Sequence, residues 1–431
     1  MDTLGGHPSH RLRNHIGHPE LMELSMSLFR EIPPTGGIPL YWKDLCSMLK
    51  IKNHGDVLES DFKNYLNVGY ARVTCSGTSA LYLILEALKE LSSRKTVIIP
   101  SFICPLVPLA IQRAGLTIEL CDIHKDDFNF NVKELEELCS KNPDVLAIVP
   151  VHLGGIPLDF DPIKNISKKH GVFLVEDCAQ SLGATYQDKK VGTLGDFSFF
   201  SLCRGKGLTL YEGGVIITHQ KDYSALLDKK VDQLVKNDFI LESLRILELL
   251  GYGLFYHPSF FWFFFKLPQI FWNLQGKRFR AFMEYFTMDF PIHNVSKMRK
   301  LIGHAHFYRL EEEIEKQSQK ASYYIEGIRN IEGIQVIKAP EYGRANYPYL
   351  TLIFDDPEKR EKALKRFEYS GLGVSQIYAC AITDYDYLKP ILPDRPCLNA
   401  RYLAEREITL STSTFLKEED LDSILNSLGD L

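Results

Sequence analysis

The sequence has no pair of cysteines in a C-x-x-C arrangement, although it contains nine cysteines. Without such pairs, the cysteines predict neither a zinc site nor a disulfide framework, and they are typical of a reducing compartment. The opening segment MDTLGGHPSHRLRNHIGHPE lacks the apolar core of a signal peptide, and its histidines lack regular metal-ligand spacing. We therefore expect a cytoplasmic protein that holds no metal.

The chain also has little excess charge. Its formal net charge is −5 at neutral pH, so it lacks the basic surface expected of a nucleic-acid-binding protein. An unbroken apolar run long enough to cross a bilayer is missing as well, because His257 and Pro258 interrupt the most aromatic stretch. With 431 residues, the chain can bury a large core, and two domains are the natural division.

Short apolar runs alternate with helical patterns up to about residue 220, among them VIIP, IELCDI, VLAIVPVH, VFLVEDC, DFSFFSL and GGVIIT. This alternation predicts an α/β fold with a mostly parallel sheet covered by helices on both faces. From about residue 300, long amphipathic helices and strands such as NYPYLTLIF predict a smaller α+β domain. We expect an N-terminal arm and segment over 1–50, a large domain over 51–295 and a small domain over 296–431.

Two polar residues stand out because each follows an apolar strand. Asp177 ends the run GVFLVED, and ligands of open α/β sheets bind outside the carboxyl ends of the strands. Lys206 lies in the turn RGKGL, where glycine on both sides lets the backbone approach a ligand. An acid for a pyridinium and an amine for an aldehyde together predict pyridoxal phosphate. A helix cap for Asp177 and a solvated loop position for Lys206 are the alternatives.

The segment ARVTCSGTSALYLILEALKEL, residues 71–91, predicts a strand, a turn and a helix. Gly77, Thr78 and Ser79 then occupy the first helical turn, where unpaired N–H groups and the helix dipole favour an anion such as phosphate. It is not a Walker loop, because no Gly-Lys-Ser/Thr follows. Serine and threonine are also common helix caps, so both functions remain open for this motif.

The motifs GTSAL, VIIPSF, VPVHLGGIPLDFDPI, VEDCAQSLGA and FSFF…K…EGG, in this order, resemble the DegT/DnrJ/EryC1/StrS family of pyridoxal-phosphate-dependent sugar aminotransferases. The resemblance covers about residues 30–220 and resumes from about residue 290. It implies the type I fold of these transferases and a homodimer with shared active sites. It also implies amino transfer, with glutamate as donor, to a nucleotide-linked keto sugar in surface polysaccharide or amino-sugar biosynthesis.

The resemblance also assigns roles to single residues. Lys206 would bond to the cofactor aldehyde and then carry the proton between carbon atoms, and Asp177 would pair with the pyridinium. Gln180 would bond to the ring oxygen. Some relatives carry histidine at the lysine position and remove a hydroxyl group, and Lys206 argues against that reaction. His152 matches a family histidine near the cofactor, although a histidine satisfied at a strand end is equally compatible.

The remaining assignments concern the phosphate, the ring face and the second subunit. Gly77 and Thr78 would hold the phosphate with a serine, for which Ser201 keeps the family's spacing to the lysine and Ser198 keeps its F-S-F context. The family's stacking aromatic is replaced by Cys104, so Phe102 would stack instead. Asn294 lies near where relatives send an asparagine into the neighbouring site. The cofactor set expected from the sequence is thus Gly77, Thr78, Ser79, Phe102, Asp177, Gln180, Ser198, Ser201, Lys206 and Asn294.

A strongly aromatic insertion, at about 240–290, lies where relatives have a shorter connection. Packing within the chain or against a second subunit would cover it. Alternatively, residues 249–280 would contact a membrane surface, with Trp262 and Trp272 at the headgroups and Lys266, Lys277, Arg278 and Arg280 meeting anionic lipid. The insertion also keeps two rival functions open. These are another pyridoxal-phosphate reaction on a lipid-like substrate, and a non-catalytic membrane-associated protein.

Overall fold

The computed structural model describes residues 29–49, 56–276 and 285–431. Its centre is a seven-stranded sheet made of β1 (Tyr70–Thr74), β2 (Thr96–Pro100), β3 (Thr117–Cys121), β4 (Val145–Ile148), β5 (Phe173–Asp177), β8 (Phe197–Ser201) and β9 (Gly214–Thr218). The strand order is β1-β9-β8-β5-β4-β2-β3. All pairs from β3 to β8 are parallel, whereas β9 is antiparallel to both β8 and β1. The mostly parallel sheet expected from the sequence is confirmed.

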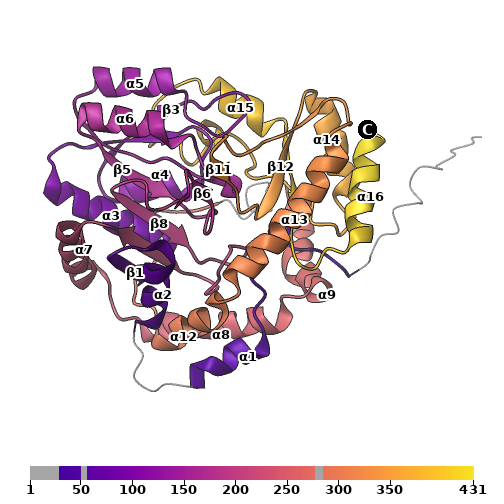
Figure 1. Ribbon diagram of the computed structural model, residues 1–431, viewed down its shortest axis with the longest axis horizontal. Coiled ribbons are helices and arrows are strands. Elements are labelled where there is room, and N and C mark those ends of the chain that lie inside the picture. The colour runs from indigo at the N-terminus through magenta and orange to yellow at the C-terminus, as the bar shows by residue number, and fades with distance from the viewer. Residues whose placement is uncertain (1–28, 50–55, 277–284) are drawn as a thin grey trace, which may run out of the picture.

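Helices connect these strands and cover the sheet (Figure 1). They are α2 (Val57–Leu66), α3 (Gly77–Leu91), α4 (Leu106–Arg113), α5 (Val132–Lys141), α6 (Phe160–His170) and α7 (Lys221–Leu234). The connection through α4 leads from β2 to β3, toward the β3 edge of the sheet. The connections through α5, from β3 to β4, and through α6, from β4 to β5, lead away from that edge. Right-handed crossovers in opposite directions place their helices on opposite faces, so the sheet is covered on both sides.

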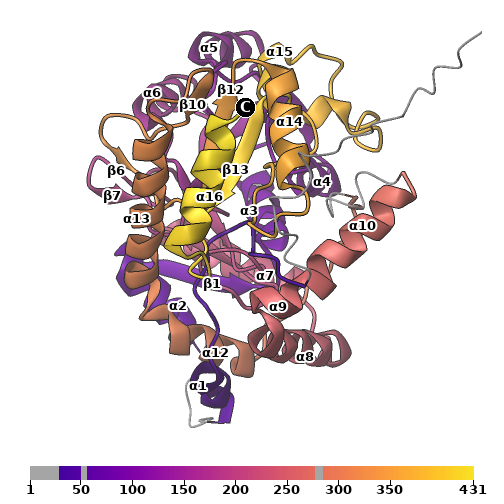
Figure 2. The ribbon, with the colours of Figure 1, turned by 90° about the vertical axis from the view of Figure 1, so that its right-hand side faces the viewer.

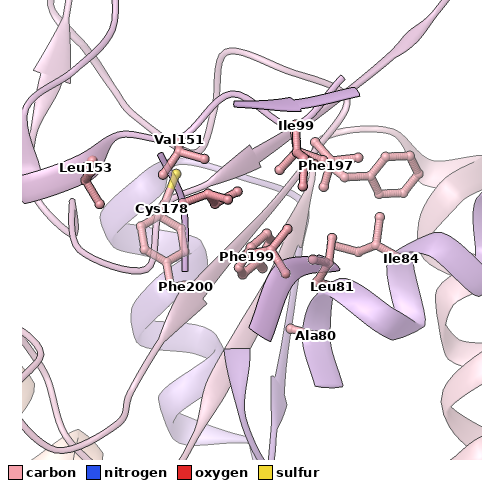
Figure 3. Close-up of a cluster of buried hydrophobic side chains, with 14 of the residues drawn as sticks. Ala80, Leu81, Ile84, Ile99, Val151, Leu153, Cys178, Phe197, Phe199 and Phe200 are labelled. Carbon is pink, nitrogen blue, oxygen red and sulfur yellow. The ribbon is translucent and has the colours of Figure 1, made fainter. Parts of the chain in front are cut away.

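The helix α3 is anchored to the middle of the sheet by its apolar face. Leu81, Leu85 and Leu88 are fully buried, as their spacing in the sequence predicted. Figure 3 shows Leu81 and Ile84 beside the rings of β8. Each buried leucine contributes about 1.5–3 kcal/mol of transfer free energy. This packing holds the first turn of α3 at a defined position against β8 and β9.

The C-terminal part contains its own antiparallel sheet, β10-β12-β13. Its strands are β10 (Ile334–Val336), β12 (Tyr349–Phe354) and β13 (Glu407–Ser411), and its helices are α12 (Lys297–Phe307), α13 (Leu310–Ile328), α14 (Pro357–Phe367), α15 (Leu398–Ala404) and α16 (Glu418–Gly429). A third small sheet joins β11 (Gly343–Arg344) to the hairpin of β6 (Thr185–Tyr186) and β7 (Lys189–Lys190). The smaller α+β unit therefore forms as expected, while the boundary at residue 295 stays a prediction.

Residues 29–49 run between the two parts and end in α1 (Trp42–Leu45) and a 3₁₀ turn, η1 (Cys46–Leu49). On one side, the Ile32 N–H donates to the Gly371 carbonyl at 2.9 Å. On the other side, the Ile38 N–H donates to the carbonyl of Gly207 at 2.8 Å. This segment therefore connects the small sheet to the turn that carries Lys206. The rest of the expected N-terminal arm lies outside the described residues.

The aromatic insertion forms three helices joined by a π-helical turn: α8 (Phe239–Phe255), α9 (Pro258–Phe261), η3 (Trp262–Lys266) and α10 (Leu267–Leu274). Packing within the chain does not cover it, because Leu247, Phe264 and Leu274 are all more than half exposed. That part of our expectation is wrong: only some of its aromatic rings stack on one another, as Phe261 and Phe265 do. No helix among the described residues is long and apolar enough to cross a membrane.

Candidate active site

The first turn of α3 lies at the end of β1, where Ser76 caps the helix. The Ser76 hydroxyl accepts from the Ser79 N–H at 3.0 Å, and the Ser79 hydroxyl accepts from the Ser76 N–H at 3.1 Å. The Ser79 side chain is fully buried. Its assignment to the cofactor is therefore corrected, because the cap uses both of its polar groups. Gly77 and Thr78 keep first-turn N–H groups that have no intrahelical acceptor.

The structure separates the two serines of β8. A Cβ atom placed on Gly77 would lie 3.3 Å from the Cβ of Ser201, so Ser201 is next to the N-terminus of α3. Ser198 is fully buried, and its hydroxyl donates to the carbonyl of Gly192 at 2.7 Å. Neighbours three residues apart on a strand point to opposite faces. Ser198 is thereby removed from the candidate site, and Ser201 remains.

Gly214, at the start of β9, closes the same corner. A Cβ atom there would collide with the Ser76 carbonyl and with the N–H of Gly77. The backbones of β9 and α3 therefore touch directly, which only glycine allows. The first-turn N–H groups of α3 and the hydroxyl of Ser201 therefore lie at one corner, at the positive end of a helix dipole that favours an anion.

Asp177 ends β5, as predicted, and its side chain is buried. Its Oδ1 accepts a bond from the Ala179 N–H at 2.9 Å. Burial raises the pKa of Asp177 to about 6, while the bond from Ala179 and the positive charge of Lys206 oppose this rise. The charge of Lys206 thus acts on Asp177, although the two residues lie 29 positions apart in the sequence.

The Lys206 turn is held from the N-terminal segment. The hydroxyl of Thr35 donates to the Gly205 carbonyl at 2.7 Å, and a Cβ atom on Gly37 would lie 2.6 Å from the Lys206 carbonyl oxygen. Gly205 has a φ of 75°, a left-handed conformation that glycine adopts without strain. No pattern in the sequence predicted this contact, because the segment lies some 170 residues upstream of the turn.

Gln180 follows Asp177 by three residues and is oriented from two sides. Its Oε1 accepts from the Gly154 N–H at 2.8 Å and from the Tyr349 hydroxyl at 2.5 Å. Since Oε1 is used in this way, the Nε2 group is the part of the amide that can donate to a ligand. Tyr349 belongs to β12, so the small sheet contributes to the site. No motif in the sequence pointed to Tyr349.

His152 proves to be a structural histidine. Its Nδ1 accepts from the Leu158 N–H at 3.1 Å, so the proton lies on Nε2, which faces Glu176 Oε2 at 3.1 Å. Its ring stacks with that of Phe160, with centroids 6.0 Å apart. The alternative of a histidine satisfied at a strand end therefore describes it best.

Glu176, which sequence reasoning missed, organises the loop beside β8. Each of its oxygens accepts two bonds: Oε1 from the N–H groups of Leu194 and Gly195, at 2.7 Å each, and Oε2 from Gly192 N–H and His152. His152, Glu176 and Cys178 lie close enough to resemble a metal site. The bonds around Glu176 already account for its burial, so no ion is needed there.

Phe102 does not offer an open ring face. It is buried, its ring lies parallel to that of Phe128 at 6.4 Å, and the edge of Tyr378 meets it at 5.2 Å. Its assignment as the stacking ring is corrected, because aromatic neighbours already cover it. Asn294 is exposed, and its amide donates to Asn237 Oδ1 at 2.6 Å. A role for Asn294 in a neighbouring subunit stays a prediction.

Comparison with known proteins now decides the family. The model of the DegT/DnrJ/EryC1/StrS aminotransferase family matches residues 48–233 and 275–429. The chain belongs to this family. Its match leaves out residues 234–274, which contain α8, α9 and α10. The insertion is therefore an addition to the common fold of the family.

Three relatives illustrate the range of similarity. A UDP-4-amino-4,6-dideoxy-N-acetyl-beta-L-altrosamine transaminase of Campylobacter jejuni is 26% identical over 86% of this chain and 90% of its own. A GDP-perosamine synthase of Caulobacter vibrioides is 37% identical, over 39% of this chain and 44% of its own. The solved structure of PseC from Helicobacter pylori, an aminotransferase of pseudoaminic acid biosynthesis, superposes with a TM-score of 0.71 at 18% identity, over 93% and 98% of the chains.

Proposed function

We propose that this protein is a pyridoxal-phosphate-dependent aminotransferase that acts on a nucleotide-linked keto sugar. One arrangement carries the proposal: Asp177 ends β5, the turn with Lys206 follows the neighbouring parallel strand β8, and the N-terminus of α3 lies next to Ser201 at the end of β8. An acid, an amine and an anion position in one corner are what this cofactor requires.

The residues present fit that cofactor. The contact of Gly214 with Gly77 leaves backbone N–H groups and the hydroxyl of Ser201 as donors for a phosphate. Bound there, pyridoxal phosphate supplies the electron sink for a carbanion. Asp177 would keep the ring nitrogen protonated, and Gln180 would donate from Nε2 to the ring oxygen. Lys206 Nζ would hold the aldehyde and would serve as the base for the proton on the donor's α-carbon.

The substrate class follows from the relatives. The synthase of Caulobacter vibrioides and the transaminase of Campylobacter jejuni carry a GDP-linked and a UDP-linked amino sugar in their names. We infer that the acceptor is a nucleotide-linked keto sugar and that glutamate is the donor. We also infer a homodimer with shared sites and a cytoplasmic location, and the nine cysteines, which form no disulfide, suit a reducing compartment.

The decisive experiment reads the cofactor directly. Purified protein with pyridoxal phosphate should absorb visible light, lose that absorption on borohydride reduction, and yield a peptide modified at Lys206. Glutamate alone should convert the bound cofactor to its pyridoxamine form in a single turnover. Modification of another lysine would reject the site. Failure of glutamate and every other amino acid to convert the cofactor would support the non-catalytic alternative.

A further inference from the structure

The helix α8 has its polarity reversed. In a surface helix of a soluble protein, the apolar side faces the core and the charged side faces water. Here the charged side faces inward: Glu242 Oε1 accepts from Arg299 Nε at 2.8 Å, and Arg245 pairs with Glu212 at 2.8 Å. The exposed side consists of apolar residues at helical spacing, namely Ile240, Leu244, Leu247 and Leu254.

A second exposed stripe runs through α9, η3 and α10. Its members are Phe260, Phe264, Leu267, Phe271 and Leu274. They recur every three or four residues, so they share one face of a continuous helical segment about 20 Å long, at 1.5 Å per residue. No residue of α10 is buried, and Figure 2 shows this helix extending away from the rest of the molecule.

The two stripes meet at Phe255. Its ring centroid lies 5.5 Å from that of Phe260 and 5.9 Å from that of Phe264. The exposed side chains of α8 and α10 therefore belong to one continuous apolar surface, which we call the apolar ridge (residues 239–274). Monomeric soluble proteins rarely expose a contiguous apolar surface of this kind unless something covers it.

The margins of the apolar ridge carry tryptophan and positive charge. The helix α1 packs against α8, and it exposes Trp42 and Lys43, while Leu49 is exposed in η1. Lys236, just before α8, is exposed as well. In the sequence, α10 is followed by QGKRFR, and its three cations, Lys277, Arg278 and Arg280, lie outside the described residues. Apolar side chains bordered by tryptophan and cations are typical of segments that lie in the headgroup region of an anionic bilayer.

We propose that the apolar ridge docks on the surface of an anionic phospholipid bilayer and lies in its interface without spanning it. This goes beyond amino transfer, because the ridge falls within the part of the chain that the family model does not match. Family members without this insertion share the common fold. Docking of the ridge would therefore place the active site next to a membrane surface.

A second copy of the chain is the competing occupant. Away from residues 29–49 and the ridge, the exposed large apolar side chains of the described residues are scattered through the sequence, as Leu91, Tyr323, Tyr342 and Leu398 illustrate. The ridge is therefore the longest run of exposed large apolar side chains among the described residues. Pairing of one ridge with the ridge of a second copy would bring the flanking cations of the two copies together, whereas anionic lipid attracts them.

Vesicle flotation of the full-length protein with its cofactor tests the proposal. We expect the protein to float with vesicles of phosphatidylcholine and phosphatidylglycerol, and less with phosphatidylcholine alone or at high salt, because salt screens the cations. The double variant Leu247→Ser/Phe264→Ser should lower the bound fraction at least tenfold. The matched control is Leu398→Ser, because Leu398 is 66% exposed and Leu247 is 64% exposed. It should float like the unaltered protein.

Three results would overturn the proposal. The first is an unaltered protein that stays unbound with both kinds of vesicle. The second is an equal loss in the Leu398→Ser control. The third concerns light scattering. If the unaltered protein binds no lipid and the double variant has half its molecular mass, the ridge is the contact with a second copy. Amino transfer assayed in solution is independent of these outcomes, so failure here leaves the proposed function standing.

Discussion

The hydroxyl of Tyr349 donates to Gln180 Oε1 at 2.5 Å, joining the small sheet to the loop after Asp177. The Gly154 N–H also donates to Oε1, so this oxygen accepts two bonds and Nε2 is left as the group of the amide that can donate to a ligand. Tyr349 thus acts as a positioning residue: it touches no reacting atom but fixes which end of the amide points into the site.

Tyr349→Phe should therefore weaken catalysis without unfolding the protein. One hydrogen bond of this kind contributes about 0.5–1.5 kcal/mol, so we expect kcat to fall about threefold to tenfold. The absorption maximum of the bound cofactor should shift, because the bond to its ring oxygen is loosened. The matched control is Tyr324→Phe: that hydroxyl is buried without a partner in the C-terminal apolar cluster. An equal effect of both changes would show that Tyr349 has only a packing role.

Asp177→Asn should lower turnover about 10- to 100-fold, since a charge-assisted contact of about 1.5–3 kcal/mol is lost. Steady-state kinetics at saturating cofactor measures this. An unchanged kcat would remove Asp177 from the mechanism.

The same substitution should stabilise the protein when the cofactor is absent. The pKa of Asp177 rises from 3.8 to about 6 on folding, so the folded state binds the proton more tightly than the unfolded state does. Stability therefore falls as the pH rises from about 4 to 6, and the cost above pH 6 is about 3 kcal/mol. Asparagine removes that cost. Thermal unfolding should show a higher Tm for the variant at pH 7.5 and a difference that shrinks toward pH 4.

The two serines of β8 provide a paired test of the phosphate position. Ser201→Ala should raise the cofactor Kd about 10- to 100-fold, as expected for a hydrogen bond to a charged group. Ser198→Ala removes a bond to the Gly192 carbonyl, so it should lower Tm and leave the Kd unchanged. Cofactor titration followed by absorbance distinguishes the two. A reversed pattern would place the phosphate next to Ser198.

Gly37→Ala should displace the Lys206 turn, because the new Cβ would lie 2.6 Å from the Lys206 carbonyl oxygen and neither backbone can yield easily. We expect at least a tenfold slower reaction of Lys206 with added cofactor, measured by stopped-flow absorbance. Gly251→Ala is the control, since a Cβ at this position of α8 meets nothing within 4 Å. Alanine there should stabilise the helix by up to about 1 kcal/mol. Equal rates in both variants would show that Gly37 does not support the turn.

Sequence alone determined the sheet, the strand ends and the two residues of opposite charge, Asp177 and Lys206. Apolar runs and their exits depend on local hydrophobic periodicity, which can be read directly from the chain. The same reasoning could not separate Ser198 from Ser201, because strand pleating and the neighbouring loop decide which face meets α3. It misjudged Phe102 and Ser79 for the same reason: burial against Phe128 and a bond to Ser76 depend on where these neighbours lie.

Only the tertiary structure revealed Tyr349, Glu176 and the N-terminal segment that holds the Lys206 turn. These contacts join residues up to 170 positions apart, and hydrogen-bond geometry between distant segments leaves no periodic signal in a sequence. The insertion is a further feature that the sequence predicted only in part. Its aromatic composition was evident in the sequence, but the outward direction of its apolar stripes depends on the pairing of Glu242 with Arg299, which turns the charged side of α8 inward.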